Sequence, residues 1–201
     1  HYLYYTNSLN VEVNMTANID VSELLTFCHT NGYKFYPTLI YCVTKVLNRI
    51  DNFKMFKDKN GDLCVWDSLV PNYTIFHEED HTFSDCWTDF TDDFGSFYKN
   101  IICDMELGKT KRGIKVMKGQ PANFYCVSCT PWTAFTAVSS RVVNGGPAFF
   151  PIITAGKYDE KNQMPVNITI AHAVADGYHI GLFFEYLQKE ISKEYLNSSL
   201  E

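Results

Sequence analysis

The chain has 201 residues, of which 46% are hydrophobic and 15% aromatic, and its formal net charge is -6. This length and apolar content suit one packed domain, and we expect residues 1–201 to form it, with an N-terminal segment missing before His1. The lysines and arginines form no basic stripe, which argues against a nucleic-acid partner. No apolar run approaches the roughly 20 residues of a membrane helix, which argues against a membrane protein.

The predicted elements come from apolar residues that recur at strand or helix spacing between turn residues. In chain order they are strand 11–19, helix 22–31, helix 37–50, hairpin strands 53–56 and 63–66, strand 73–77, helix 84–101, strands 123–129, 152–158 and 164–171, and helix 180–187. They predict an α/β (α+β sandwich) fold, in which one mixed β-sheet is covered by helices.

Single residues mark the ends of several of these elements. Ser22 and Ser84 are predicted to cap the helices that they begin, and Pro37 suits the first turn of the second helix. Gly32 ends the first helix, and Asn60-Gly61 suits the tight turn of the hairpin.

The seven cysteines predict a reducing compartment, because an odd number cannot all pair. Cys28, Cys42 and Cys103 lie within apolar patterns, where a free thiol behaves as a small buried hydrophobe. We therefore expect a cytoplasmic protein. Cys126 and Cys129 form a Cys-x-x-Cys pair, but residues three apart in a strand point to opposite faces, which disfavours a zinc or redox role.

A histidine and an aspartate lie four residues apart where the last predicted strand meets the last helix. His172 leaves the strand 164–171, and Asp176 precedes Gly177 at the start of the helix. Imidazole titrates near neutral pH, so a histidine held at such a boundary can accept and return a proton in one catalytic cycle. A metal site built from His172, Asp176 and His179 is an alternative, although the spacing resembles no common zinc signature.

The segment around His172 and Asp176 resembles the signature of the chloramphenicol acetyltransferases, in which a histidine, three residues and then Asp-Gly mark the general base. Six further segments resemble that family in the same order. They are 34–37 (KFYP), 65–68 (VWDS), 73–77 (YTIFH) with 82–84 (TFS), 128–132 (SCTPW) and 151–158 (PIITAGKY). The resemblance covers nearly the whole chain and implies the fold of CoA-dependent acyltransferases.

The resemblance implies catalytic roles for four residues. His172 is the expected base, Ser128 the hydroxyl that bonds the tetrahedral oxyanion, and Thr154 a support for the same intermediate through water. In the family, the aspartate at Asp176 pairs with an arginine near the N-terminus and so fixes the loop that aims the histidine. That arginine has no counterpart after His1, so we expect Asp176 to have another cation or water as its partner.

The resemblance also implies two binding regions. The predicted coenzyme A site consists of Lys34, Tyr36, Trp132, Lys157 and Tyr158, and the predicted acceptor site of Tyr5, Thr74, Phe83, Phe124 and Val138. Val138, with Val13 and Val116, replaces larger aromatic residues, so a wider acceptor pocket is expected. No permanently bound cofactor or metal is expected, since acetyl-CoA is a co-substrate.

We therefore expect a homotrimeric O-acetyltransferase with active sites between subunits, which transfers acetyl from acetyl-CoA to chloramphenicol. Two alternatives stay open. One is the same chemistry on another small hydroxyl acceptor, and the other is a non-catalytic trimeric binding protein of the same fold.

Overall fold

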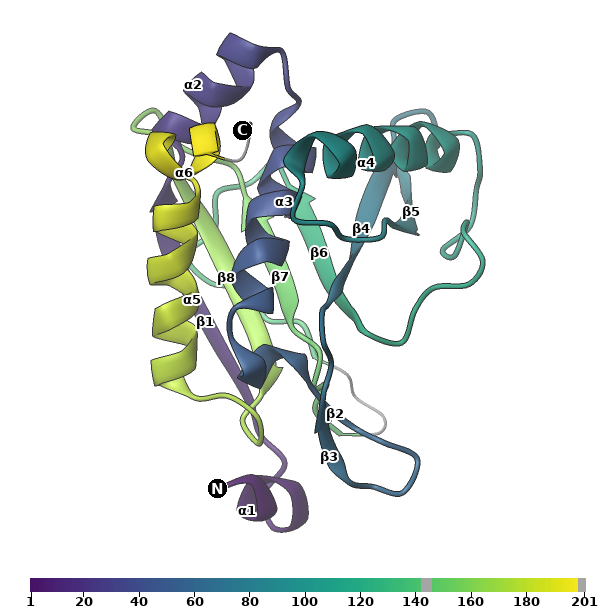
Figure 1. Ribbon diagram of the computed structural model, residues 1–201, viewed down its shortest axis with the longest axis vertical. Helices are drawn as coiled ribbons and strands as arrows, with labels where there is room; N and C mark the ends of the chain where they lie inside the picture. The colour runs from purple at the N-terminus through teal and green to yellow at the C-terminus, as the bar shows by residue number, and fades with distance from the viewer. Residues whose placement is uncertain (142–145, 199–201) are drawn as a thin grey trace.

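The computed structural model describes residues 1–141 and 146–198 (Figure 1). Its centre is a six-stranded mixed sheet in the order β1-β8-β7-β6-β4-β5, and a separate hairpin pairs β2 with β3. The elements are α1 (Tyr2–Asn7), β1 (Glu12–Asp20), α2 (Ser22–Asn31), α3 (Phe35–Asn48), the 3₁₀ helix η1 (Asp51–Lys54), β2 (Met55–Lys57), β3 (Leu63–Val65), β4 (Val70–His77), β5 (Thr82–Trp87), α4 (Phe94–Lys109), β6 (Phe124–Thr130), β7 (Ile152–Gly156), β8 (Gln163–Ala171), α5 (Gly177–Glu190) and α6 (Lys193–Ser198). The predicted α/β fold is confirmed.

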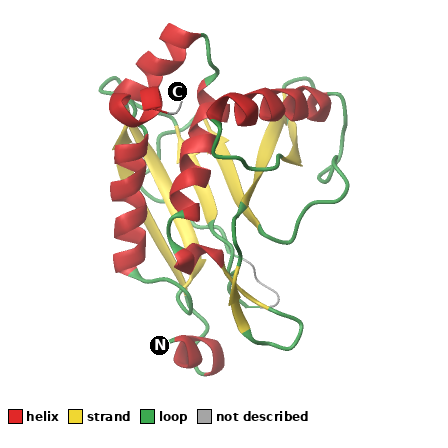
Figure 2. Cartoon of the chain, in the orientation of Figure 1, coloured by secondary structure: helices red, strands yellow, loops and turns green. Residues whose placement is uncertain are grey.

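Helices α3, α4 and α5 pack against one face of this sheet (Figure 2). Strand residues alternate between the two faces, so every second residue of a strand points to these helices. Met164, Val166, Ile168 and Ile170 of β8 point to the helices and join the buried core. We call this the helix face. The residues between them point to the opposite side, which we call the open face. Segment 131–141 passes over part of the open face, since a Cβ on Gly156 would lie 2.7 Å from the Phe135 ring.

The prediction of a helix capped by Ser84 is wrong. Residues Thr82–Trp87 form β5, which pairs with β4 in antiparallel register after a turn that includes His81 at a φ of 56°. Trp87 matched the helical spacing by coincidence. The helix begins at Phe94, and the Asp93 carboxylate caps it by accepting the Ser96 N–H at 2.8 Å.

Two smaller predictions are also corrected. Ser22 is the first residue of α2 and no cap, and its N–H donates to the Asp20 carboxylate at 2.9 Å. Helix α3 begins at Phe35, two residues before Pro37. The helix tolerates Pro37 because a proline in the first turn sacrifices no intrahelical hydrogen bond. Gly32 ends α2 with a φ of 72°, as predicted.

In the described part of the chain, none of the helices is both long enough and apolar enough to cross a lipid bilayer.

Candidate active site

His172 lies immediately after β8, at the end of the sheet nearest α1 (Figure 1). Its backbone N–H donates to the Val11 carbonyl at 2.8 Å, which ties it to the start of β1. Its Nδ1 lies 3.2 Å from the Ala175 carbonyl oxygen. A carbonyl can only accept, so Nδ1 carries the proton, and in the neutral ring Nε2 keeps its lone pair. The ring is therefore held as the tautomer that a general base needs.

The imidazole ring also stacks on Tyr5, the first of the predicted acceptor residues. The two ring centroids are 4.1 Å apart and the planes differ by 16°. His172 and Tyr2 line a cavity of about 250 Å³ at this end of the molecule. The remaining lining residues are His1, Asn52, Met55, Leu63, Ala173, Val174, Ala175, Asp176 and His179. The base is thus accessible from a cavity and supported on one ring face.

Asp176 caps α5 and forms no hydrogen bond with the His172 ring. Its Oδ1 accepts the Tyr178 N–H at 3.0 Å and lies 2.8 Å from His179 Nδ1. Burial acts to raise the pKa of Asp176, but the Tyr178 hydrogen bond and the adjacent His179 outweigh it and lower the pKa. The partners of Asp176 in the structure are therefore His179 and the backbone N–H of Tyr178. Asp176 does not orient His172 as the aspartate of a catalytic triad would.

Ser128 and Thr154 lie side by side on the open face, since they are register partners on β6 and β7. Directly opposed residues have Cβ atoms about 5 Å apart. Asn167 on β8 is the next member of this row, and its amide nitrogen donates to Asn14 Oδ1, the Met15 carbonyl and Thr16 Oγ1 at 3.0–3.1 Å. The predicted oxyanion pair is thus adjacent and belongs to a polar row that extends to β1.

The structure does not bring His172 and Ser128 together within one chain. Ser128 shares a row with Asn167, two strands away, which corresponds to about 10 Å. His172 lies five positions beyond Asn167 along the chain, a distance of about 16 Å. The two Cα atoms are therefore about 19 Å apart, too far for one acyl group to contact both side chains.

Most of the predicted acceptor residues lie on the open face with Ser128. Thr74 on β4 is next to the core residue Ile75, so its side chain points to the open face. The register of the strands places Phe83 on β5 and Phe124 on β6 on the same face. Val138 lines a cavity of about 380 Å³ beside Asn14 and Asn167. Tyr5 is separate from this group because it stacks on His172.

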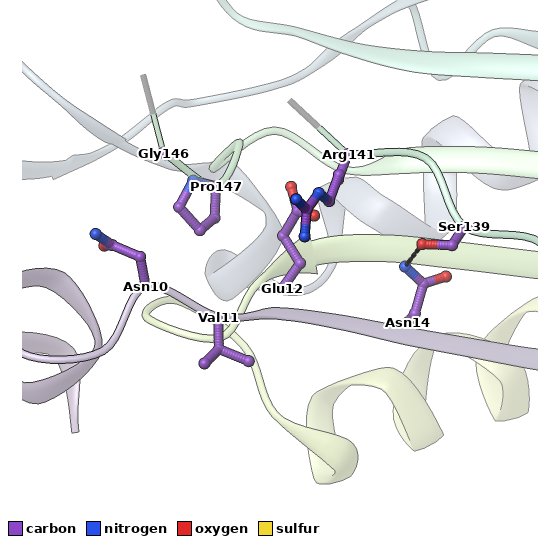
Figure 3. Close-up of a pocket in the computed structure, with 8 residues that line it drawn as sticks. All are labelled: Asn10, Val11, Glu12, Asn14, Ser139, Arg141, Gly146 and Pro147. Carbon is purple, nitrogen blue, oxygen red and sulfur yellow. Dashed lines mark hydrogen bonds between the residues drawn. The ribbon is translucent and has the colours of Figure 1, made fainter. Parts of the chain in front are cut away.

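A larger cavity of about 640 Å³ lies at the His172 end of the open face (Figure 3). Its lining is mostly polar, and Asn14 donates to Ser139 across it at 3.1 Å. Glu12 contributes Oε1, a buried atom with no hydrogen-bond partner among the described residues. The open face is therefore hollowed next to the start of β1.

Three of the five predicted coenzyme A residues line a single cavity. Trp132, Lys157 and Tyr158 surround a space of about 810 Å³ beyond the ends of β6 and β7. Phe35, which lies between Lys34 and Tyr36 in the sequence, has its ring centroid 6.1 Å from that of Tyr158. The start of α3 thus adjoins this cavity.

Lys34 and Tyr36 make other contacts at the start of α3. Lys34 Nζ is 3.5 Å from a Glu106 carboxylate oxygen on α4, and both side chains are exposed. Burial raises the pKa of Tyr36, so its hydroxyl remains protonated and donates to the Val127 carbonyl at 3.2 Å. Tyr36 therefore ties α3 to β6 beside Ser128.

The two cysteines of the Cys-x-x-Cys pair are partly buried and do not face each other. Cys126 and Cys129 point to opposite faces of β6, and burial raises the pKa of each thiol to about 11. All seven cysteines are free thiols. Cys28 and Cys42 are buried as expected, whereas Cys103 is exposed, so the expectation for Cys103 is wrong.

Sequence reasoning missed two residues that hold the loop around His172. Asn52 Nδ2 donates to the Val174 carbonyl at 2.7 Å, and it comes from η1, more than a hundred residues away in sequence. His179 was considered only as a metal ligand, although its place three residues after Asp176 is the capping-box spacing that could have shown its role.

A family model described as chloramphenicol acetyltransferase matches residues 1–188. Chloramphenicol acetyltransferases are among the similar curated proteins. That of Clostridium perfringens is 38% identical over 97% of this chain and 90% of its own length, and that of Clostridium butyricum is 37% identical over 94% and 88%.

Solved structures of two kinds of acetyltransferase share the fold. A chloramphenicol acetyltransferase structure aligns with a TM-score of 0.81 and 20% identity, covering 95% of this chain and 93% of its own. A dihydrolipoamide acetyltransferase from Azotobacter vinelandii aligns with a TM-score of 0.69 and 14% identity, covering 98% and 86%.

Proposed function

The chain belongs to the chloramphenicol acetyltransferase family and is an acyltransferase, as its sequence predicted, and on this premise we propose that it transfers acetyl from acetyl-CoA to a hydroxyl of chloramphenicol. The observation that carries this proposal is the His172 tautomer. The Ala175 carbonyl holds the Nδ1 proton, so Nε2 is free to act as a base at the cavity.

In the proposed reaction, His172 Nε2 removes the proton of the acceptor hydroxyl as its oxygen attacks the thioester carbonyl of acetyl-CoA. The carbonyl oxygen becomes an oxyanion, to which the Ser128 hydroxyl donates a hydrogen bond. Thr154, beside Ser128, supports the same intermediate through a water molecule. When the intermediate collapses, the C–S bond breaks, and the imidazolium returns its proton to the coenzyme A thiolate. No group other than the two substrates is consumed.

The two substrates are assigned to different regions of the chain. We assign acetyl-CoA to the cavity of Trp132, Lys157 and Tyr158 and to the adjoining Lys34 and Tyr36, where aromatic rings and cations suit an adenine and phosphates. The acceptor is assigned to the open-face residues Thr74, Phe83, Phe124 and Val138 and, beside the base, to Tyr5.

We further propose a homotrimer with the active site between subunits. The separation of about 19 Å between His172 and Ser128 supports this arrangement, since a second copy is needed to place a serine beside the base. Each site would combine His172 and Tyr5 of one chain with Ser128 of its neighbour. Seven free thiols suit the cytoplasm as its location, and neither a nucleic acid nor a membrane is a proposed partner.

Thiol release from acetyl-CoA tests the activity. We expect release that depends on chloramphenicol and falls by about 10²-fold or more when His172 is replaced by Ala. Turnover that shows no preference for chloramphenicol would favour another small hydroxyl acceptor. A protein that releases no thiol with any alcohol would contradict acetyl transfer and favour a non-catalytic binding protein.

Mixed assemblies test the shared site. Co-assembled His172→Ala and Ser128→Ala subunits should regain activity, because some interfaces then pair a native histidine with a native serine. Assemblies verified by mass spectrometry that remain no more active than either parent would exclude a site built from two subunits.

A further inference from the structure

We propose that His179 is a positioning residue for the reaction, which acts through Asp176 to fix the Ala175–Asp176 peptide group that holds the His172 proton. The proposal rests on the proposed function of His172 as the base. His179 itself touches neither the reacting atoms nor the His172 ring in any hydrogen bond of the described structure.

The contact between His179 and Asp176 is short and directional. Nδ1 of His179 lies 2.8 Å from Asp176 Oδ1 and 3.3 Å from the Asp176 backbone nitrogen. One nitrogen cannot donate to the first and accept from the second at the same time. The ionised carboxylate and the shorter distance place the proton on Nδ1, so His179 donates to Asp176.

The Asp176 carboxylate is thereby held by two donors from the first turn of α5. Oδ1 accepts the Tyr178 N–H at 3.0 Å as well as the His179 proton. The histidine stands at the helix position where a capping box usually has glutamate or glutamine, but here it donates to the Asp176 carboxylate and does not accept from the Asp176 N–H. The N-terminal end of α5 and the backbone of Asp176 therefore form one rigid unit.

That unit includes the nitrogen of the Ala175–Asp176 peptide group, whose carbonyl oxygen fixes the tautomer of His172. The nitrogen of the Ala175–Asp176 peptide belongs to the capped residue, and its carbonyl oxygen accepts from His172 Nδ1 at 3.2 Å. Because a peptide group is planar, fixing the nitrogen and Cα of Asp176 also fixes the direction of the Ala175 carbonyl. His172 thus contacts this peptide group at its carbonyl oxygen, whereas His179 acts on it through the side chain of Asp176.

Asn52 supports the loop at a separate point. Its side chain donates to the Val174 carbonyl, one peptide group earlier. With Val174 tied to η1, the Ala175 carbonyl can still rotate unless Asp176 is also held. The role of His179 is therefore distinct from general anchoring of the loop.

Two substitutions at position 179 separate positioning from simple helix capping. His179→Ala removes the donor, whereas His179→Gln keeps an amide donor for the carboxylate and the usual capping-box chemistry. We expect His179→Ala to lower kcat about tenfold with both KM values nearly unchanged, since a displaced base loses alignment. His179→Gln should stay within about threefold of the native kcat. His29→Ala, an exposed histidine on α2, is the matched control and should leave kcat unchanged.

The second readout is the tautomer of His172, which a purely structural role would not change. In ¹⁵N-histidine-labelled protein, the His172 signals are identified by their loss in His172→Ala. We expect the Nδ1–H tautomer in the native protein and in His179→Gln, and a mixture with the Nε2–H tautomer in His179→Ala.

Each result has a defined meaning. An unchanged tautomer and unchanged kcat in His179→Ala would overturn the proposal, as would an equal loss of kcat in both variants with a lower melting temperature. A native protein without acetyl transfer would contradict the proposed function instead, and the tautomer measurement would still decide whether His179 orients His172.

Discussion

His172 and His77 are both hydrogen-bonded histidines at the ends of strands, yet their ring nitrogens are engaged in different ways. His77 is 3% exposed, and its Nε2 lies 2.8 Å from Ser84 Oγ. The Ser84 hydroxyl donates its hydrogen to the Gly113 carbonyl at 2.7 Å. It can therefore only accept from His77, so His77 Nε2 is the donor. The histidine therefore joins β4, β5 and the loop at Gly113 as a structural crosslink.

In His172 the opposite nitrogen is engaged, and the consequence is functional. The Ala175 carbonyl accepts a hydrogen bond from Nδ1–H, so Nε2 remains unprotonated as a base that is accessible from a cavity. A hydrogen bond from one ring nitrogen is common to both residues, so it does not by itself identify a base. The two histidines differ in which ring nitrogen forms the hydrogen bond and in whether the other ring nitrogen is accessible.

The largest expected effect is that of His172→Ala. Removal of a positioned base should lower kcat by about 10²- to 10⁴-fold. Folding should be nearly unaffected, because the ring is only partly buried. Steady-state kinetics with acetyl-CoA and a thermal melt check both expectations. A loss of less than about tenfold would remove the distinction between the two histidines.

Ser128→Ala should have the next largest effect, a fall in kcat of about 10²-fold with little change in either KM. The hydroxyl bonds an oxygen that is negative only in the intermediate, so its loss affects the transition state and not the ground state. Thr130→Ala, two residues along the same face of β6, is the control and should leave kcat nearly unchanged. A raised KM with normal kcat would instead identify Ser128 as a binding residue.

The sequence predicted most of the sheet, because strands such as 164–171 carry their own periodicity. It failed at β5, where the spacing of Trp87 and Phe90 resembled a helix while the true strand is defined by pairing with β4. Pairing depends on residues outside the local window. The short alternation from Thr82 to Cys86 was too weak to outweigh the helical pattern that followed.

For the site, the resemblance supplied His172 and Ser128, but no local pattern could give their relation. That relation depends on strand order, which places β8 two positions from β6 and so separates the two residues by about 19 Å. The sequence likewise left the partner of Asp176 open as another cation or water, and the structure shows that it is His179, one helical turn away.

His77→Ala should affect stability and not turnover. It removes the donor to a buried serine hydroxyl and leaves a small cavity, which we expect to cost about 2 kcal/mol. Urea unfolding should show a lower midpoint with an unchanged slope, and kcat per folded protein should stay native. A variant of native stability with reduced kcat would show that His77 contributes to the chemistry and would contradict its structural role.

The smallest expected effect concerns Asp176, the cap beneath the His172 loop. Asp176→Ala should cost about 1 kcal/mol at neutral pH, the usual value of a helix N-cap. The side chain is 42% exposed, so a larger cost is not expected.

Since the pKa of Asp176 is lowered in the folded chain, its charge stabilises the fold fully above the unfolded pKa of about 3.9. That contribution is lost as the pH falls through the lower folded pKa. The stability difference between native protein and Asp176→Asn, which keeps a neutral cap, should therefore shrink below about pH 4. A difference that is constant from pH 7 to pH 3 would show that the Asp176 charge has no part in holding the loop, in which case the backbone alone would orient His172.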